Sequence, residues 1–115
     1  MVDEAGYGAL DRAVREAIDL GRIGHPSFVR CVAIAPDGEA DATFDGVASL
    51  AEGWLGGAPE SRFRQGGAGR SHVVELLKWE GGEGGLIMVS ESPSVGAPTM
   101  DLMVIGSRGA IYHQA

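Results

Sequence analysis

The sequence SHVVELLKWE, residues 71–80, is followed by GGEG, residues 81–84, and then by GLIMVSES, residues 85–92. The two flanking stretches are rich in β-branched and other apolar residues, whereas the four residues between them are typical of a turn. Two such stretches joined by a short glycine-rich turn predict a β-hairpin with antiparallel strands. This is the strongest hairpin signal in the chain.

Two stretches nearer the N-terminus have the apolar spacing of helices. Between residues 7 and 20, apolar residues recur at steps of three and four, and Gly21 follows the last of them as a cap. Residues 44–55 repeat this spacing, and a Gly-Gly pair and Pro59 end it. The sequence therefore predicts helices over 7–20 and 44–55.

Four further segments have the composition of strands. They are residues 27–35, 61–65, 100–105 and 110–113. The second is either a short edge strand, which we favour, or a loop in which Arg62 and Arg64 are merely solvated. Helices and antiparallel strands are thus segregated along the chain, which predicts an α+β fold: an open, mainly antiparallel sheet with two helices packed on one face.

Apolar residues lie on both sides of the first hairpin strand. Because side chains alternate along a strand, Val73, Leu77 and Trp79 lie on one side. Val74 and Leu76 lie on the other. Two short helices cannot cover both faces of such a sheet, so we expect the second face to meet another copy of the chain, as a homodimer, or a separate protein subunit.

Size and charge narrow the classes of function. The 115 residues, 44% of them hydrophobic, are typical of one folded domain, which we expect to span 1–115. Nine basic against 16 acidic residues give a net charge of −7, which argues against nucleic acid and anionic membranes as partners. No apolar run approaches the roughly 20 residues of a membrane span, and the acidic start MVDEAG is unlike a secretory signal, so we expect a cytoplasmic protein.

Residues that usually carry metal or nucleophilic chemistry are few and scattered. The three histidines stand far apart, and the single cysteine, Cys31, lies within a predicted strand, where a thiol is more often buried than nucleophilic. The glycine runs at 66–69 and 81–85 do not follow a strand and open a helix, as a phosphate loop must. We therefore expect no metal, no cofactor and no catalytic residue.

Three residues are candidates for binding a small polar ligand. Arg30, His72 and Lys78 have even numbers within their predicted strands, so one sheet face could collect their hydrogen-bond donors if the strand registers agree. Such a site would suit hydroxyl or carboxylate groups. The alternative is that these side chains lie at strand ends or at the sheet rim and contact only water.

Three quoted stretches carry a family resemblance: ALDRAVREAIDLGRIGHP at 9–26, EGWLGG at 52–57 and MDLMVIGSRGAIY at 100–112. With the hairpin, they resemble the C-terminal domain of the glucose–fructose oxidoreductase/inositol dehydrogenase family, whose members are NAD(P)-dependent sugar and polyol dehydrogenases. In that family the first stretch leads a helix into the first sheet strand, the second ends the active-site helix and the third is the closing strand. The resemblance implies that a ligand site would lie where the helix from Phe44 meets the sheet.

The resemblance also identifies what this sequence lacks. Family members carry a Rossmann-type nucleotide-binding domain before this region, for which 115 residues leave no room. The Glu-Lys-Pro motif of the family's catalytic lysine is absent, and Lys78, in a strand, does not take over its role. Alignment on Trp54 places Val47 at the family's active-site His and Leu50 at its Asp. Sliding the alignment by two residues brings Ser49 to the His position, which restores no group that titrates near neutral pH.

Two hypotheses about function follow. In the first, the chain is a stand-alone, redox-inactive relative of a substrate domain that binds a small polar ligand or acts as an oligomerising accessory protein. In the second, it is an enzyme: the substrate half of a split NAD(P)-dependent oxidoreductase, or a domain recruited to a non-redox reaction. We favour the first, because hydride transfer requires a cofactor site and a proton-transfer group, and this sequence supplies neither.

Overall fold

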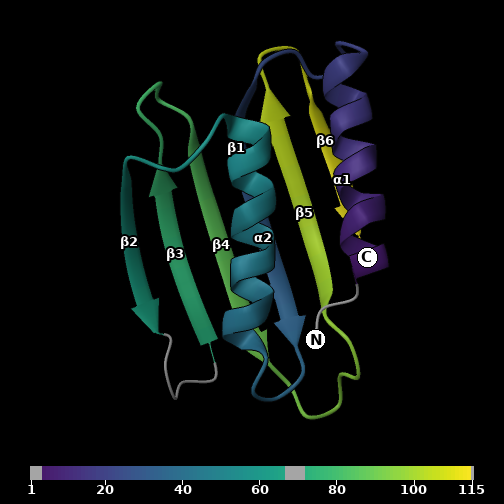
Figure 1. Ribbon diagram of the computed structural model, residues 1–115, viewed down its shortest axis with the longest axis vertical. Helices are drawn as coiled ribbons and strands as arrows, with labels where there is room; N and C mark the ends of the chain where they lie inside the picture. Colours follow the sequence, from purple (N-terminus) through teal and green to yellow (C-terminus); the bar gives the residue numbers. More distant parts are fainter. Residues whose placement is uncertain (1–3, 67–71, 115) are drawn as a thin grey trace.

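A computed structural model of the chain describes residues 4–66 and 72–114. Its elements are α1 (Glu4–Asp19), β1 (Pro26–Ala35), α2 (Ala40–Leu55), β2 (Ser61–Gly66), β3 (His72–Lys78), β4 (Gly84–Glu91), β5 (Thr99–Gly106) and β6 (Ala110–Gln114). The six strands form one open sheet in the order β2-β3-β4-β1-β5-β6, and both helices lie on the same face of it (Figure 1).

The predicted hairpin lies in one half of the sheet, and β1 lies near its centre. β3 pairs antiparallel with β4 from His72↔Ser90 to Lys78↔Gly84, as the glycine-rich turn predicts. β1 pairs with β4 in parallel and with β5 antiparallel, and the other described pairings are antiparallel. The first strand of the chain is therefore enclosed by strands that come much later in the sequence.

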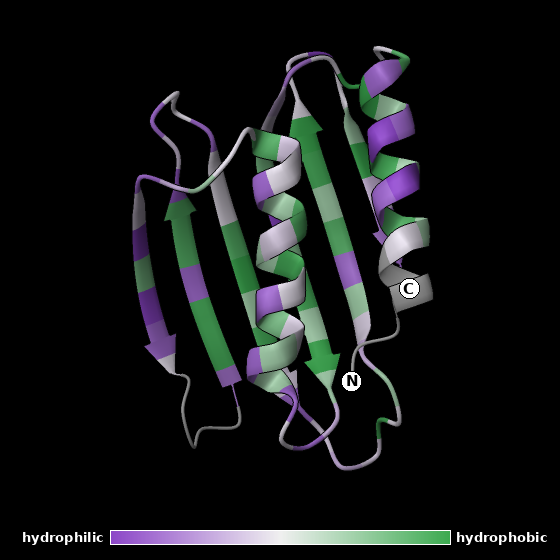
Figure 2. Ribbon diagram, viewed as in Figure 1, coloured by the Kyte–Doolittle hydropathy of each residue, from purple (hydrophilic) through white to green (hydrophobic). Residues whose placement is uncertain are grey.

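The hydrophobic core lies between the sheet and the helices. Val29, Cys31 and Ala33 of β1 point toward the helices and are buried. Helix α2 packs on β1 and β4, and α1 lies beside α2 and next to β6 (Figure 1). The central strands are mainly hydrophobic, whereas edge strand β2 and the outward side of α1 carry many hydrophilic residues (Figure 2). The expected α+β fold, with two helices on one face of a mainly antiparallel sheet, is confirmed.

The first turn of helix α2 is held by a residue from β4. The helix begins at Ala40, before the predicted start at Phe44. The backbone N–H of Ala40 donates to Glu91 Oε2 at 3.0 Å. A carboxylate at this place satisfies a free N–H of the helix and interacts favourably with the helix dipole. The early start thus depends on a residue that is close only in the folded chain.

Two turns far apart in sequence pack against each other at the start of β1. The N–H of Arg108 donates to the carbonyl oxygen of Ile23 at 2.8 Å, and the N–H of Ser107 donates to that of His25 at 3.0 Å. Gly106 lies so close to the Ile23 carbonyl that any Cβ there would collide with it. This contact joins the end of the α1–β1 connection to the β5–β6 turn.

The observed strands agree with the predicted ones to within two residues at each described boundary. Residues 61–66 form the edge strand that we favoured, and α1 begins at Glu4, earlier than the predicted position 7. Ser71, the predicted first residue of the hairpin, and positions 67–69 of the first glycine run lie outside the described residues. Within the described ranges, no helix is long and apolar enough to cross a membrane.

Candidate functional site on the open face of the sheet

The sheet face that points away from the helices, called here the open face, is crossed by two rows of paired residues. Strand registers place one residue from each of the six strands in each row. The Arg30 row consists of Phe63, Leu76, Leu86, Arg30, Met103 and Tyr112. The Asp101 row consists of Gln65, Val74, Met88, Val32, Asp101 and Gln114.

Large apolar side chains of the open face are exposed. Six of them have 39–61% of their surface accessible to water. They are Val32, Ile34, Phe63, Leu76, Met88 and Tyr112. Monomeric soluble proteins rarely expose large contiguous apolar patches, and such patches commonly mark interaction sites. The open face is therefore the first candidate for a functional surface.

Two charged side chains lie within this apolar surface. Arg30 and Asp101 are the only charged residues of the two rows, and they occupy adjacent strands. Arg30 is directly opposite Met103, and Asp101 is directly opposite Val32, so the two charges are diagonal neighbours. No ion pair within the described ranges includes either of them.

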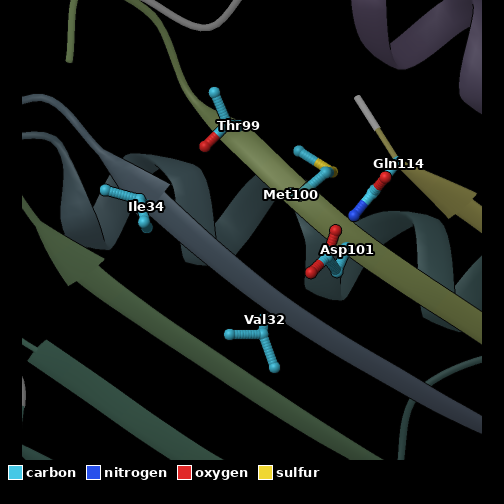
Figure 3. A pocket seen from close by; sticks show the side chains of 6 residues that line it. All are labelled: Val32, Ile34, Thr99, Met100, Asp101 and Gln114. Carbon is cyan, nitrogen blue, oxygen red and sulfur yellow. The ribbon is translucent and has the colours of Figure 1, made fainter.

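A hollow of about 400 Å³ lies beside Asp101 (Figure 3). Its lining residues are Val32, Ile34, Thr99, Met100, Asp101 and Gln114. The side chains of Asp101 and Gln114 point toward one another, with Val32 on the other side of the carboxylate (Figure 3). The hollow thus combines apolar walls with a carboxylate, an amide and a hydroxyl group, a lining that suits a cation with an apolar stem or a ligand with hydroxyl groups.

The three predicted ligand-binding residues lie on the open face, as their shared even phase predicts, but the structure does not bring them together. His72 and Lys78 occupy the two ends of β3, six residues and therefore roughly 20 Å apart. Arg30 lies on β1, which is separated from β3 by β4. All three are exposed and lie on the face opposite α2, because the alternate positions of their strands are buried against the helices. They therefore do not surround the place where α2 meets the sheet.

The two positions of α2 that the resemblance assigns to a proton-transfer pair belong to the core. Val47 is 1% exposed, and Leu50 is partly buried against the same hydrophobic cluster. Near them, Trp54 donates its indole N–H to Asp11 Oδ1 of α1 at 2.8 Å, which fixes the two helices side by side. This side of α2 is therefore used for packing.

Sequence analysis missed a buried ionic cluster around Glu75, which is 1% exposed on the helix-facing side of β3. Its carboxylate accepts hydrogen bonds from Arg64 Nε at 2.7 Å and from Arg62 Nη1 at 3.3 Å. Arg62 also donates to Glu52 of α2 at 2.9 Å, and the Arg64 guanidinium lies 4.7 Å from the centre of the Phe44 ring. The alternative of merely solvated arginines is therefore wrong.

One sequence signal could have revealed this cluster. Glu75 has the same phase along its strand as the buried residues Val73 and Leu77, so it must point into the core, where a carboxylate requires cationic partners. The neighbouring edge strand supplies them at Arg62 and Arg64, two residues apart. Two guanidinium groups face the carboxylates of Glu52 and Glu75, so the cluster is balanced in charge and offers no free cation to a ligand.

The single cysteine of the chain, Cys31, is buried in the core. Burial, aided by the negative charge of Asp101, raises the pKa of the Cys31 thiol to about 12. At neutral pH the thiol is therefore protonated and inert. Among the described residues, no three His, Cys, Asp or Glu side chains converge as metal ligands would.

Comparison with known proteins gives structural neighbours only. No protein-family model and no curated protein sequence matches the chain. A solved structure described as a probable dehydrogenase from Thermotoga maritima has a TM-score of 0.74 at 22% identity, over 90% of this chain and 38% of that one. myo-Inositol 2-dehydrogenase from Lactobacillus plantarum has a TM-score of 0.70 at 16% identity, over 90% and 38%. scyllo-Inositol dehydrogenase from Lactobacillus casei has a TM-score of 0.68 at 13% identity, over 89% and 36%.

These neighbours establish the fold. The chain has the fold of one part of several dehydrogenases, among them two named for inositols, and this confirms the fold that the sequence resemblance implied. It spans less than two fifths of the length of the first neighbours. Their reactions and substrates are properties of those longer proteins.

Proposed function

We propose that this chain is a redox-inactive relative of a dehydrogenase substrate domain and that it acts as an assembly module, pairing with a second copy through the open face. The observation that carries the proposal is the exposed apolar surface of the Arg30 row and the Asp101 row, on a face without helices. Burying apolar surface is favourable by roughly 25 cal/mol per Å². The molecule measures 39 × 28 × 18 Å, and its broad side is large enough for the roughly 800 Å² that each partner of a typical interface buries.

The redox-inactive part of the proposal is supported by the residues of α2. Oxidising a hydroxyl group by hydride transfer requires a group that takes up the hydroxyl proton. Val47 and Leu50, which the sequence resemblance places at the positions of the proton-transfer pair, are apolar and belong to the core or pack against it. A titratable side chain at position 47 would be buried away from water. Burial disfavours its charged form, so it would not serve in proton transfer.

Assembly and cofactor binding are tested by two measurements on the purified chain. Sedimentation equilibrium at tens of micromolar should give twice the monomer mass of 11.9 kDa. Calorimetric titration with NAD⁺ and with NADP⁺ should give no saturable binding. A monomer at these concentrations would overturn the assembly role, and micromolar binding of either nucleotide would overturn the redox-inactive role.

A second candidate function is binding of a small polar ligand on the same face, which the hollow beside Asp101 favours. Arg30, His72 and Lys78 would each offer one cationic or donor group to a carboxylate- or hydroxyl-bearing molecule, at separate places on the face. myo-Inositol is the obvious first probe, because a structural neighbour is named for its oxidation. Calorimetric binding of this probe by the wild-type chain, and its loss in the Asp101→Ala variant with the fold retained, would support this function, because Asp101 supplies the carboxylate of the hollow.

The enzymatic alternative is that this chain supplies the substrate half of an oxidoreductase whose nucleotide site is on another subunit, or that it catalyses a non-redox reaction. The share of the dehydrogenase neighbours that it covers is compatible with such a division. Co-purification of the native protein with a nucleotide-binding subunit, and inositol-dependent reduction of NAD⁺ by that complex, would favour this alternative.

A further inference from the structure

The open face contains two charged side chains that could not be buried in an interface without partners of opposite charge. Arg30 and Asp101 lie beside exposed apolar side chains of the face, and neither forms an ion pair within the described chain. Burying a charge without a partner of opposite sign is strongly unfavourable. If this face is covered, as the proposed function requires, each of these two charges needs a group of opposite sign within the interface.

A second copy of the chain supplies both groups at once. In a two-fold dimer each contact occurs twice, so one operation that sets Arg30 against the partner's Asp101 also sets Asp101 against the partner's Arg30. We propose that two chains stack open face to open face about such an axis, with Arg30 and Asp101 forming two reciprocal ion pairs between them. This inference rests on the proposed assembly function and specifies its register.

The sheet geometry fixes where the two-fold axis must run. Arg30 and Asp101 are one diagonal of a four-residue cell, and Val32 and Met103 are the other. An axis that exchanges the first two residues lies in the interface, passes through the middle of the cell, and so runs close to Val32 and Met103. Each of these two apolar side chains then meets its own counterpart, and the apolar parts of both rows are buried together.

The hollow beside Asp101 has the lining that an incoming arginine needs. The apolar stem of the partner's Arg30 would lie against Val32 and Ile34, and its guanidinium would reach the Asp101 carboxylate (Figure 3). A planar guanidinium can donate two parallel hydrogen bonds to one carboxylate. The hollow therefore has room for the proposed contact.

The distribution of acidic residues favours a second copy over an unrelated partner. The chain has 16 acidic residues and a net charge of −7, so two copies repel each other on average. Within the described strands, however, Asp101 is the only acid on the open face, because Glu75 and Glu91 belong to the helix-facing side. Arg30 and Lys78 outnumber this one acid on the described strands, so the open face does not share the negative charge of the chain and two copies can approach through it.

Charge reversal tests the proposed pairing. Arg30→Asp and Asp101→Arg should each raise the dimer dissociation constant at least roughly 30-fold, because each leaves like charges facing one another across the interface. The double variant Arg30→Asp/Asp101→Arg exchanges the two charges and should bring the constant back to within about tenfold of the original. Lys78→Asp is the matched control: it reverses a charge on the same face outside the two rows, and it should leave the dimer intact.

Chemical cross-linking tests the axis independently of charge. Val32→Cys should be joined to its own counterpart by a short bismaleimide, because both thiols lie near the axis. Ser61→Cys, at the far corner of the face on edge strand β2, should not be joined. The native Cys31 is buried and protonated, so it does not compete.

The outcomes separate this inference from the proposed function. A wild-type monomer would overturn both. A dimer that tolerates both single reversals, or that cross-links through position 61 and not through position 32, would overturn the Arg30–Asp101 register and leave assembly through the face in place. If a reversal variant fails to fold by circular dichroism, the cross-linking result alone decides.

Discussion

Glu75 and its two arginine partners should contribute unequally to stability: removing the arginines should cost more than replacing the carboxylate. Removing both of its partners, in Arg62→Ala/Arg64→Ala, leaves a buried carboxylate uncompensated. The free energy of unfolding should fall by about 3 kcal/mol, at the low end for buried ion pairs because both arginines are partly exposed. Glu75→Leu instead fills the site with an apolar side chain while the arginines turn to water, and should cost less than about 1.5 kcal/mol.

Urea denaturation measures both variants, and the triple variant is the decisive control. Adding Glu75→Leu to Arg62→Ala/Arg64→Ala removes the uncompensated charge and should recover most of the lost stability. Equal losses in the double and triple variants would mean that the arginines stabilise β2 by packing and not by neutralising Glu75.

Cys31 should be unreactive in the folded protein. Its pKa is about 12 in the folded chain against an ordinary value of 9.0, because burial disfavours the thiolate. The thiol's contribution to stability is thus fully present below pH 9 and is lost as pH rises toward 12. A disulfide reagent at pH 8 should label less than a few per cent of the native protein in the time that it labels the urea-unfolded chain completely. Rapid stoichiometric labelling of the native protein would contradict the burial of β1.

At the scale of the element, helix α2 depends on a cap that comes from a strand. Glu91 of β4 accepts the N–H of Ala40, so Glu91→Ala should free the first turn of the helix. The expected loss of stability is about 1 kcal/mol, the usual value of a helix N-terminal cap. Hydrogen exchange of the amides at the start of α2 should become faster, while exchange at Ala51 and Trp54 should remain as it is.

Glu91→Gln is the matched control for this prediction. It keeps an oxygen acceptor and removes the negative charge, so it should recover the hydrogen bond but not the interaction with the helix dipole. Identical exchange rates in the alanine and wild-type proteins would show that the early start of α2 does not depend on Glu91.

At the scale of the whole molecule, replacing an apolar residue by aspartate should have different effects on the two faces of the sheet: loss of the fold on one and loss of the dimer on the other. Ile87 is fully buried on the helix-facing side of β4, so Ile87→Asp should prevent folding, at a cost of about 4 kcal/mol or more. Leu76 is 52% exposed on the open face of the neighbouring strand. Leu76→Asp should leave the fold intact and abolish the dimer.

Circular dichroism and sedimentation distinguish the two results. Leu76→Asp should keep the native spectrum and sediment as a monomer. A dimeric Leu76→Asp protein would count against the open face as the interface, and a folded Ile87→Asp protein would count against the packing of α2 on β4.

Several features of the molecule followed from local patterns in the sequence. A strand needs only alternation and turn residues around it, so the six strands could be predicted to within two residues, including the edge strand at 61–66. The phase of alternation also predicted that Arg30, His72 and Lys78 share one face. It could not predict that they are separated along and across the sheet, because their distances depend on strand order and register.

The sequence by itself determined the class of fold, the positions of its strands and the presence of apolar side chains on both faces of the sheet, because each of these depends on residues a few positions apart. Only the tertiary structure decided that β1 lies between β4 and β5, that Glu91 caps α2, that Glu75 has two arginine partners, and that Arg30 and Asp101 are diagonal neighbours on an open face. These four features join residues distant in the chain, and no local pattern specifies which distant residues become neighbours once the strands have paired.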